Sequence, residues 1–149
     1  MENFLILHNI RSVFNVGSIF RTADAFGVKK IYLTGYTPDP AQKTALGAEN
    51  YVSREKLKNI HNLIRRLKSQ GFFVVSVEQA KKSTDIKKFS KRKIKKLTLI
   101  FGNEVHGLSR SVLGKSDAIV EIPMRGKKES LNVSVAAGIA LYALSNPIA

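Results

Sequence analysis

The stretch Leu97-Thr98-Leu99-Ile100-Phe101-Gly102-Asn103-Glu104 joins an apolar run of strand length to a glycine and two polar residues. A short run of this composition predicts a buried strand. Ligands of parallel sheets bind beyond the carboxyl ends of the strands, where Gly102, Asn103 and Glu104 fall. The stretch therefore predicts both a central strand and one wall of a site.

Strand and helix signals alternate on both sides of this stretch. Four further runs have strand character, at residues 4–7, 30–33, 72–77 and 118–122. Apolar residues at helical spacing predict helices over residues 16–26, 57–67 and 133–144, the first two ending at Gly27 and Gly71. Residues 34–54 contain Pro38, Pro40 and Gly47 and predict a long loop with one helical turn. The pattern predicts an α/β fold with a mostly parallel sheet flanked by helices, in a single domain over residues 1–149.

The charge of the chain indicates its class of partner. A formal net charge of +14 on 149 residues is typical of a protein that binds a polyanion, so nucleic acid is the expected partner. A membrane surface is the less favoured alternative, because the amino terminus has neither a basic amphipathic anchor nor a lipidation signal. No apolar run approaches the roughly 18 residues of a membrane span. We expect no membrane association and a cytoplasmic location.

Several kinds of chemistry are disfavoured by residue type. Cysteine is absent, which excludes disulfides, thiolate metal sites and a covalent Cys adduct. His8, His61 and His106 are too scattered to predict a metal site. The segment Gly114-Lys115-Ser116 lacks the first glycine of a nucleotide phosphate loop, because that position is Ser109. Neither a metal nor nucleotide hydrolysis is expected.

Three separated segments contain the main functional signal. They are Asn15-Val16-Gly17-Ser18-Ile19-Phe20-Arg21, then Phe101-Gly102-Asn103-Glu104-Val105-His106-Gly107-Leu108-Ser109, then Ile122-Pro123-Met124 with Ser130-Leu131-Asn132-Val133-Ser134. Together they resemble the three signature motifs of the SpoU/TrmH-type RNA 2′-O-ribose methyltransferases of the SPOUT superfamily. The resemblance spans about residues 7–144 and implies a minimal single-domain member. It also implies a deep trefoil knot in roughly residues 97–144, where connection rules alone predict an unknotted chain.

The first motif contains the leading catalytic candidate. We expect Asn15 to cap a helix and Gly17 to allow close approach of another chain. By residue type alone Arg21 is a solvated helix arginine, but the resemblance implies that it acts on the ribose hydroxyl. A guanidinium has a pKa above about 12 and only donors. We therefore favour a role in stabilising the developing alkoxide and orienting the adjacent phosphate, with the proton leaving to water or another group.

The resemblance assigns two sets of residues around this arginine. The catalytic set is Arg21, Asn15, Glu104, Ser130 and Asn132. The implied cofactor is S-adenosylmethionine, and the matched residues are Val77, Glu78, Gly102, Asn103, Ile122, Met124 and Leu131. We expect Glu104 to hold Arg21 or the reacting group in place, although a structural salt bridge is an equal alternative. Ser130 or Asn132 would also suit a helix cap.

Two basic segments are predicted to bind RNA. The denser one, residues 81–96, includes Lys87, Lys88, Lys91, Arg92 and Lys93. The other contains Arg125, Lys127 and Lys128. The alternative for the denser segment is a solvated, partly disordered face.

The expected function is methyl transfer from S-adenosylmethionine to a ribose 2′-hydroxyl of structured transfer or ribosomal RNA. The resemblance implies a homodimer in which Arg21 reaches toward the cofactor site of the partner. Two alternatives stay open. One is a non-catalytic RNA-binding or ribosome-assembly protein, and the other is a methyltransferase of the same superfamily that acts on a base nitrogen.

Overall fold

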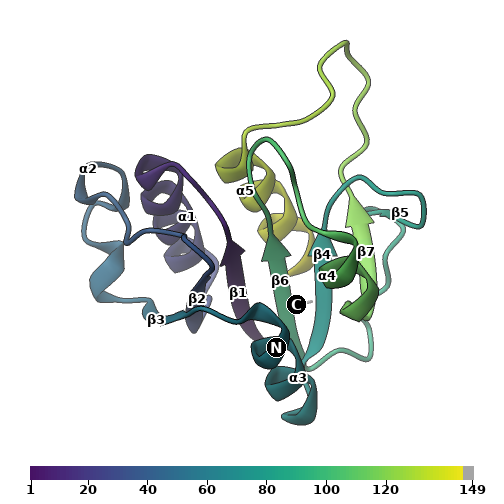
Figure 1. Cartoon of the computed structure of the whole chain (residues 1–149), viewed down its shortest axis with the longest axis horizontal. Coiled ribbons are helices and arrows are strands. Elements are labelled where there is room, and N and C mark those ends of the chain that lie inside the picture. Colours follow the sequence, from purple (N-terminus) through teal and green to yellow (C-terminus); the bar gives the residue numbers. More distant parts are fainter. Residues whose placement is uncertain (146–149) are drawn as a thin grey trace.

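The computed structural model describes residues 1–145 and shows a parallel sheet between two layers of helices (Figure 1). The sheet of this part of the chain has seven strands in the order β3-β2-β1-β6-β4-β7-β5, and all neighbours are parallel. The strands are β1 (Glu2–His8), β2 (Lys30–Thr34), β3 (Ser53–Leu57), β4 (Phe73–Val77), β5 (Thr84–Asp85), β6 (Lys96–Phe101) and β7 (Ala118–Glu121). The predicted α/β class with a parallel sheet is confirmed.

Helices cover both faces of the sheet, so the central strands are apolar on both sides. One face packs against α1 (Val13–Ala25) and α5 (Val133–Leu144), and the other against α3 (Ile60–Ser69) and α4 (Arg110–Lys115). In β1, Leu5 and Leu7 join the first cluster while Ile6 joins the second. The short α2 (Gln42–Ala45) and the 3-10 helix η1 (Ala48–Asn50) lie beside α1.

The five predicted strands are confirmed to within two residues, but β3, β5 and α4 were not predicted. β3 is an exposed edge strand of sequence Ser-Arg-Glu-Lys-Leu, which has no apolar run to reveal it. Its presence corrects two expectations: residues 34–54 are not one loop, and Leu57 belongs to β3 rather than to a helix. α3 begins only at Ile60, after the cap Asn59.

The amino terminus of α1 corrects the expected cap. The helix is capped by Ser12, whose side chain accepts a hydrogen bond from the Asn15 backbone N–H at 3.2 Å. Asn15 therefore lies inside the first turn. Its side chain is free to point toward other parts of the chain.

Gly17 faces a segment of its own chain rather than another molecule. A Cβ atom there would collide with the side chain of Thr44 and the carbonyl oxygen of Ala41. The Thr44 hydroxyl in turn donates to the Phe14 carbonyl oxygen at 2.9 Å, which ties α2 to α1. The glycine thus allows these two helices to touch.

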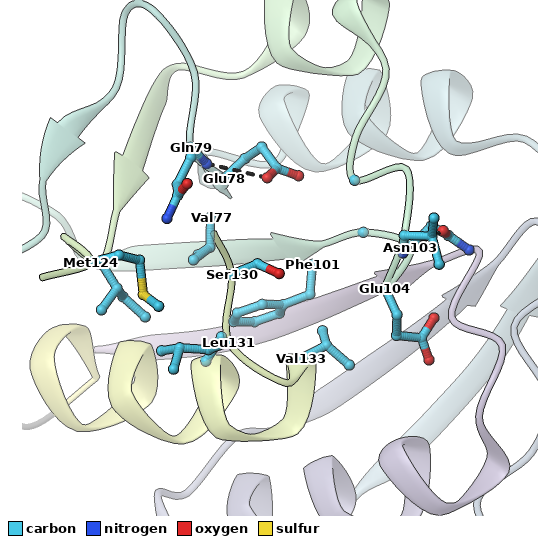
Figure 2. A pocket seen from close by; sticks show the side chains of 15 residues that line it. Val77, Glu78, Gln79, Phe101, Asn103, Glu104, Met124, Ser130, Leu131 and Val133 are labelled. Atoms are coloured by element: carbon cyan, nitrogen blue, oxygen red, sulfur yellow. Dashed lines mark hydrogen bonds between the residues drawn. The ribbon is translucent and has the colours of Figure 1, made fainter. Parts of the chain in front are cut away.

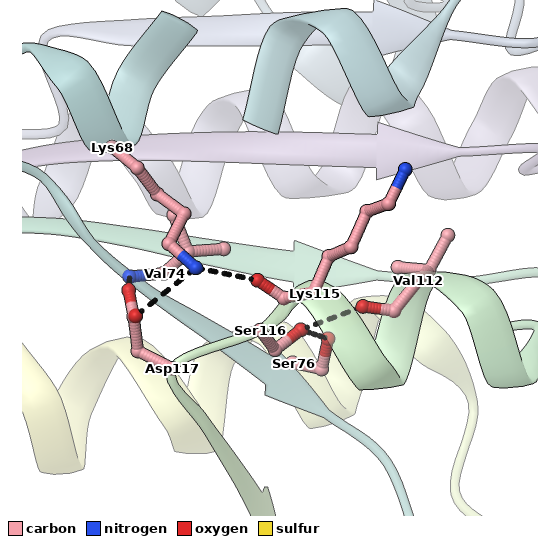
Figure 3. Close-up of polar contacts among 7 residues, drawn as sticks. All are labelled: Lys68, Val74, Ser76, Val112, Lys115, Ser116 and Asp117. Atoms are coloured by element: carbon pink, nitrogen blue, oxygen red, sulfur yellow. Dashed lines mark hydrogen bonds and ion pairs between the residues drawn. The ribbon is translucent and has the colours of Figure 1, made fainter. Parts of the chain in front are cut away.

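A polar cluster fixes the start of β4 against the start of β7, at the end of the strands opposite the site (Figure 3). The Asp117 carboxylate accepts from the Val74 N–H at 2.8 Å and pairs with Lys68 at 3.3 Å. The hydroxyls of Ser76 and Ser116 lie 2.5 Å apart. These contacts tie β7, which the third motif follows, to its neighbour β4.

Candidate active site

A first cavity opens beyond the carboxyl ends of β4, β6 and β7 (Figure 2). All residues predicted to contact the cofactor line it, namely Val77, Glu78, Gly102, Asn103, Ile122, Met124 and Leu131. Met124 and Glu104 lie toward opposite sides of the view, with Ser130 and Phe101 between them. The second and third motif segments therefore share one site at the sheet edge where ligands bind.

Six lining residues were not predicted. They are Gln79, Phe101, Val105, Gly107, Val133 and Ala136. Most lie inside or directly beside the quoted motif segments, so position next to a motif residue was an available signal. Ala136 is different, because it reaches the cavity only through its place one turn after Val133 in α5.

The side chains of Glu78 and Asn103 hold the loop 103–108 in place. Asn103 Nδ2 donates to the Asn9 carbonyl oxygen and to the Tyr36 hydroxyl, and its Oδ1 accepts from the N–H groups of Val105 and His106. These bonds use the full capacity of the amide. The Glu78 carboxylate accepts from the Leu108 N–H at 2.9 Å, and a Cβ on Gly107 would collide with it. Both side chains shape the wall, which leaves backbone groups to face a ligand.

Packing also requires a residue without a side chain at Gly102. A Cβ atom on it would lie 2.7 Å from the side chain of Leu108. The missing side chain therefore lets the loop fold back over the end of β6.

A second cavity of about 570 Å³ adjoins the first. The two share a wall made of Glu104, Val105, Ser130, Leu131 and Val133. The second cavity adds Arg11, Ser12, Asn15 and Asn132. A ligand in one cavity is thus separated from a ligand in the other only by groups of the second and third motifs.

Glu104 anchors the start of α1. Its carboxylate accepts from the backbone N–H of Arg11 at 2.9 Å, the backbone N–H of Ser12 at 3.1 Å and Asn15 Nδ2 at 3.2 Å. Burial opposes ionisation, but these hydrogen bonds together outweigh it and lower the pKa of Glu104. Within residues 1–145 the carboxylate of Glu104 binds the loop before α1 and Asn15 rather than Arg21 of the same chain, so its expected role toward Arg21 or the reacting group stays a prediction.

Asn15 connects the three motifs. While its Nδ2 donates to Glu104, its Oδ1 accepts from Asn132 Nδ2 at 3.2 Å. Asn132 caps α5 by accepting from the Ser134 N–H at 2.8 Å, so of the two residues that would suit a helix cap it is Asn132 that forms it. Four of the five predicted catalytic residues, Asn15, Glu104, Ser130 and Asn132, therefore line the second cavity.

Arg21, the fifth predicted catalytic residue, does not lie with the other four at the second cavity. It is exposed near the middle of α1 and lines neither cavity. It lies seven residues after Phe14, which places both on one side of the helix.

The comparison with known families decides the affiliation of the chain. The sequence model of the SpoU rRNA methylase family matches residues 2–142. The chain belongs to this family. An uncharacterised tRNA/rRNA methyltransferase of Borreliella burgdorferi is 35% identical over 148 residues, and a tRNA (guanosine(18)-2′-O)-methyltransferase of the same bacterium is 32% identical over 144 residues. Each match covers 97% of this chain but only 64% and 63% of the respective relative, so the chain spans less than two thirds of these proteins.

Solved structures of SpoU-family proteins share the fold. An AdoMet-bound rRNA methyltransferase of Sinorhizobium meliloti superposes with a TM-score of 0.88 at 31% identity, over 95% of this chain and 55% of the other. A structure described for 2-OH methylation of C/U34 on tRNA superposes at 0.79 with 25% identity, over 95% of this chain and 92% of the other. This chain thus covers nearly the whole length of that second protein.

The basic segment 81–96 of this SpoU-family chain, called the strap below, is anchored along the outer edge of the sheet. Ile86 is buried, and Phe89 and Ile94 pack against the core. The Lys91 ammonium donates to the Ala143 carbonyl oxygen at the end of α5, and burial lowers its pKa. The exposed basic residues of the strap include Lys87, Lys88, Arg92 and Lys93.

The second basic segment, with Arg125, Lys127 and Lys128, is exposed in the long connection between β7 and α5 (Figure 1). This connection leads directly into Ser130 and Leu131 of the shared wall. The residues described by the structure contain no helix long and apolar enough to cross a membrane. Within the same range, no three His, Asp or Glu side chains gather to hold a metal ion.

Proposed function

We propose that this SpoU-family chain transfers the methyl group of S-adenosylmethionine to a ribose 2′-hydroxyl of transfer or ribosomal RNA. The observation that supports this most is the pair of adjoining cavities. One is lined by every residue matched to the cofactor, and the other by the polar residues matched to the reacting end. The relatives named as tRNA or rRNA methyltransferases support the same reaction class.

The first cavity suits the proposed cofactor. Its apolar walls, from Val77, Ile122 and Leu131, fit an adenosine, and the backbone of the loop 102–107 offers polar groups. Its volume of about 150 Å³ is below the roughly 300–1,000 Å³ of typical ligand pockets. The cavity is open on one side, and residues 124–131, which belong to no helix or strand, contribute part of its wall.

The bound cofactor would supply an electrophilic methyl group on a sulfonium. The reaction forms an O–C bond at the ribose, breaks the C–S bond and releases the hydroxyl proton. Glu104 is poorly suited to accept that proton, because three hydrogen bonds occupy its carboxylate and its pKa is lowered. Its role in this proposal is to hold the loop of Arg11 and Ser12 and the amide of Asn15 around the reacting group.

A homodimer would bring Arg21 to the reaction. Exposed apolar side chains lie on α5 at Val135, Ile139 and Tyr142 and on α1 at Phe14, and such a patch suits a subunit interface. Arg21 is on the same side of α1 as Phe14. We infer that it completes the site of the partner subunit, where its guanidinium stabilises the developing alkoxide and orients the adjacent phosphate.

Calorimetric titration with S-adenosylmethionine and S-adenosylhomocysteine tests the cofactor. We expect one site per chain in the wild type and loss of binding in Ile122→Glu, which places a charge in the apolar wall. Nucleoside analysis of methylated total tRNA and rRNA then tests the target atom, with 2′-O-methyl nucleosides expected. Absence of cofactor binding supports the non-catalytic RNA-binding alternative, and a methylated base supports the base-nitrogen alternative.

Mixing of two inactive variants tests the action of Arg21 across the dimer. Arg21→Ala and Ile122→Glu are each expected to be inactive, but random exchange of subunits yields about half heterodimers, each with one intact site. Activity of about a quarter of the wild type should therefore return. If the mixture stays inactive while sedimentation shows heterodimers, Arg21 acts within its own subunit or not at all.

Two further features belong to the same proposal. The family resemblance implies a trefoil knot over residues 97–144, and we include it in the proposal. Mechanical extension of the chain from its ends should leave it shorter than its full contour length if the knot is present.

A cytoplasmic location follows from the proposed RNA substrates and is tested by cell fractionation.

A further inference from the structure

Arg11 is a basic residue of the second cavity that no motif matched. It lies between β1 and α1 and contributes to the cavity wall together with Ser12, Asn15 and Asn132. Its side chain is exposed and has no hydrogen-bond or ion-pair partner among residues 1–145. Other basic residues at the sheet face, such as Lys30 and Arg66, pair with Glu55.

The backbone of Arg11 is held on both sides. The N–H of Ile10, which is buried, donates to the Thr37 hydroxyl at 3.0 Å. The N–H of Arg11 itself donates to Glu104 Oε1 at 2.9 Å, and the N–H of Ser12 donates to Glu104 Oε2 at 3.1 Å. The position from which the guanidinium extends is therefore rigid, which lowers the cost of using it to bind a ligand.

The charges of this cavity favour an anion at Arg11. Arg11 and Glu104 are the charged residues of the wall. The carboxylate is directed at backbone N–H groups and at Asn15, whereas the guanidinium is unpaired. A planar guanidinium binds a phosphate through two parallel hydrogen bonds, so a phosphate is the ligand that matches it best.

The chemistry of ribose methylation places such a phosphate in this cavity. The 2′-oxygen and the 3′-oxygen of a ribose are on adjacent carbons, and in RNA the 3′-oxygen bears the phosphodiester. A ribose in this cavity with its 2′-oxygen toward the shared wall of Ser130 and Glu104 thus brings its 3′-phosphate into the cavity that Arg11 also lines.

We propose, on the basis of the proposed function, that Arg11 binds the 3′-phosphate of the nucleotide to be methylated, in the same subunit as the second cavity. Arg11 is then a substrate-binding residue that selects a nucleotide within a chain over a free nucleoside. It acts separately from Arg21, which lines neither cavity of its own subunit.

A binding experiment that needs no turnover tests this contact. Protein saturated with S-adenosylhomocysteine is titrated with the four ribonucleoside 3′-monophosphates and with the matching nucleosides, and ¹H–¹⁵N spectra report the Arg11 Nε–H and the Asn132 amide. We expect the monophosphates to bind about tenfold or more tightly than the nucleosides, as a charged hydrogen bond would give. Arg11→Ala should abolish this preference. Arg110 is another exposed arginine, at the start of α4, and Arg110→Ala should keep the preference.

A kinetic experiment distinguishes this contact from a structural role. With total tRNA and rRNA as methyl acceptors, Arg11→Ala should raise KM about tenfold with a smaller change in kcat, and reduce the slope of log KM against log salt by about one. The KM of Arg11→Lys should fall between those of the wild type and Arg11→Ala. Lysine keeps the positive charge but cannot make the two parallel hydrogen bonds of a guanidinium. Arg11→Ala keeps the N–H that binds Glu104, so its thermal midpoint should match the wild type.

Two results would overturn the inference. One is equal binding of monophosphates and nucleosides, and the other is equal kinetics of Arg11→Ala and Arg110→Ala. Failure of the proposed function would look different, because the wild type would then incorporate no methyl group into RNA ribose while the binding experiment could still show the phosphate contact.

Discussion

The side-chain amides of Asn15 and Asn132 meet at 3.2 Å although 117 residues separate them in the sequence. The same Asn15 amide donates to Glu104, so one side chain joins the first motif to the second and to the third. An amide can do this because it has a donor and an acceptor group on one planar unit.

Removal of either amide should affect transfer in a coupled way. We expect Asn15→Ala and Asn132→Ala each to lower kcat. The increase in activation free energy of the double variant should be smaller than the sum of the two single increases by about 0.5–1.5 kcal/mol. The affinity of Asn15→Ala for S-adenosylhomocysteine should stay within about twofold, since Asn15 does not line the first cavity. A double-mutant cycle of kcat measures the coupling, with Asn62→Ala on α3 as the control. Strictly additive losses would show that the two amides act independently.

Neutralising Glu104 should reduce stability at neutral pH. The folded-state pKa of Glu104 is lowered, so its ionised form stabilises the fold above the unfolded value of about 4.3, and this contribution disappears as the pH falls through the folded pKa. We expect Glu104→Gln to lose about 1–3 kcal/mol at pH 7, because the new amide places a donor against N–H groups. Urea unfolding at several pH values should show the two proteins converging in acid. A constant difference at every pH would contradict this account.

Gly17→Ala tests the contact between α1 and α2. The added methyl group collides with Thr44 and with the Ala41 backbone, so we expect a loss of about 1–3 kcal/mol despite the better helix propensity of alanine. Gly114→Ala in α4 is the matched control, because nothing lies within 4 Å of its Cβ position. It should be neutral or stabilising by up to about 1 kcal/mol. Equal unfolding free energies for the two variants would rule out the collision.

Lysines of the strap should contribute to RNA affinity through salt-dependent contacts. We expect Lys87→Ala/Lys88→Ala to weaken binding of total tRNA and to lower the salt slope by up to about two. The control is Lys29→Ala/Lys58→Ala, which removes the same charge from exposed positions outside the strap. Fluorescence anisotropy at several salt concentrations measures both. If the two double variants behave alike, the strap adds only net charge.

The central strands and the edge strand β3 show how much of the fold the sequence pattern predicts. The core of the sheet was predictable because buried strands require apolar runs, and residues 97–101 supply one on both faces. β3 was not predictable, since an edge strand is held by backbone hydrogen bonds, which residues with polar side chains form equally well. The order of the strands was also beyond the sequence, because it depends on contacts between segments far apart in the chain.

The sequence by itself determined the α/β class, the basic character and the residues around the first cavity, because each is encoded by local runs or by motif residues. Only the tertiary structure decided what these residues do to one another. It made Ser12 the cap of α1 and freed Asn15 for Glu104 and Asn132. It also placed Arg11 at the second cavity and left Arg21 outside both. The hydrogen bonds of Glu104 with Arg11 and Asn15, and of Asn132 with Asn15, join residues about 90 to 120 positions apart, so their partners are fixed only when the strands have found their order.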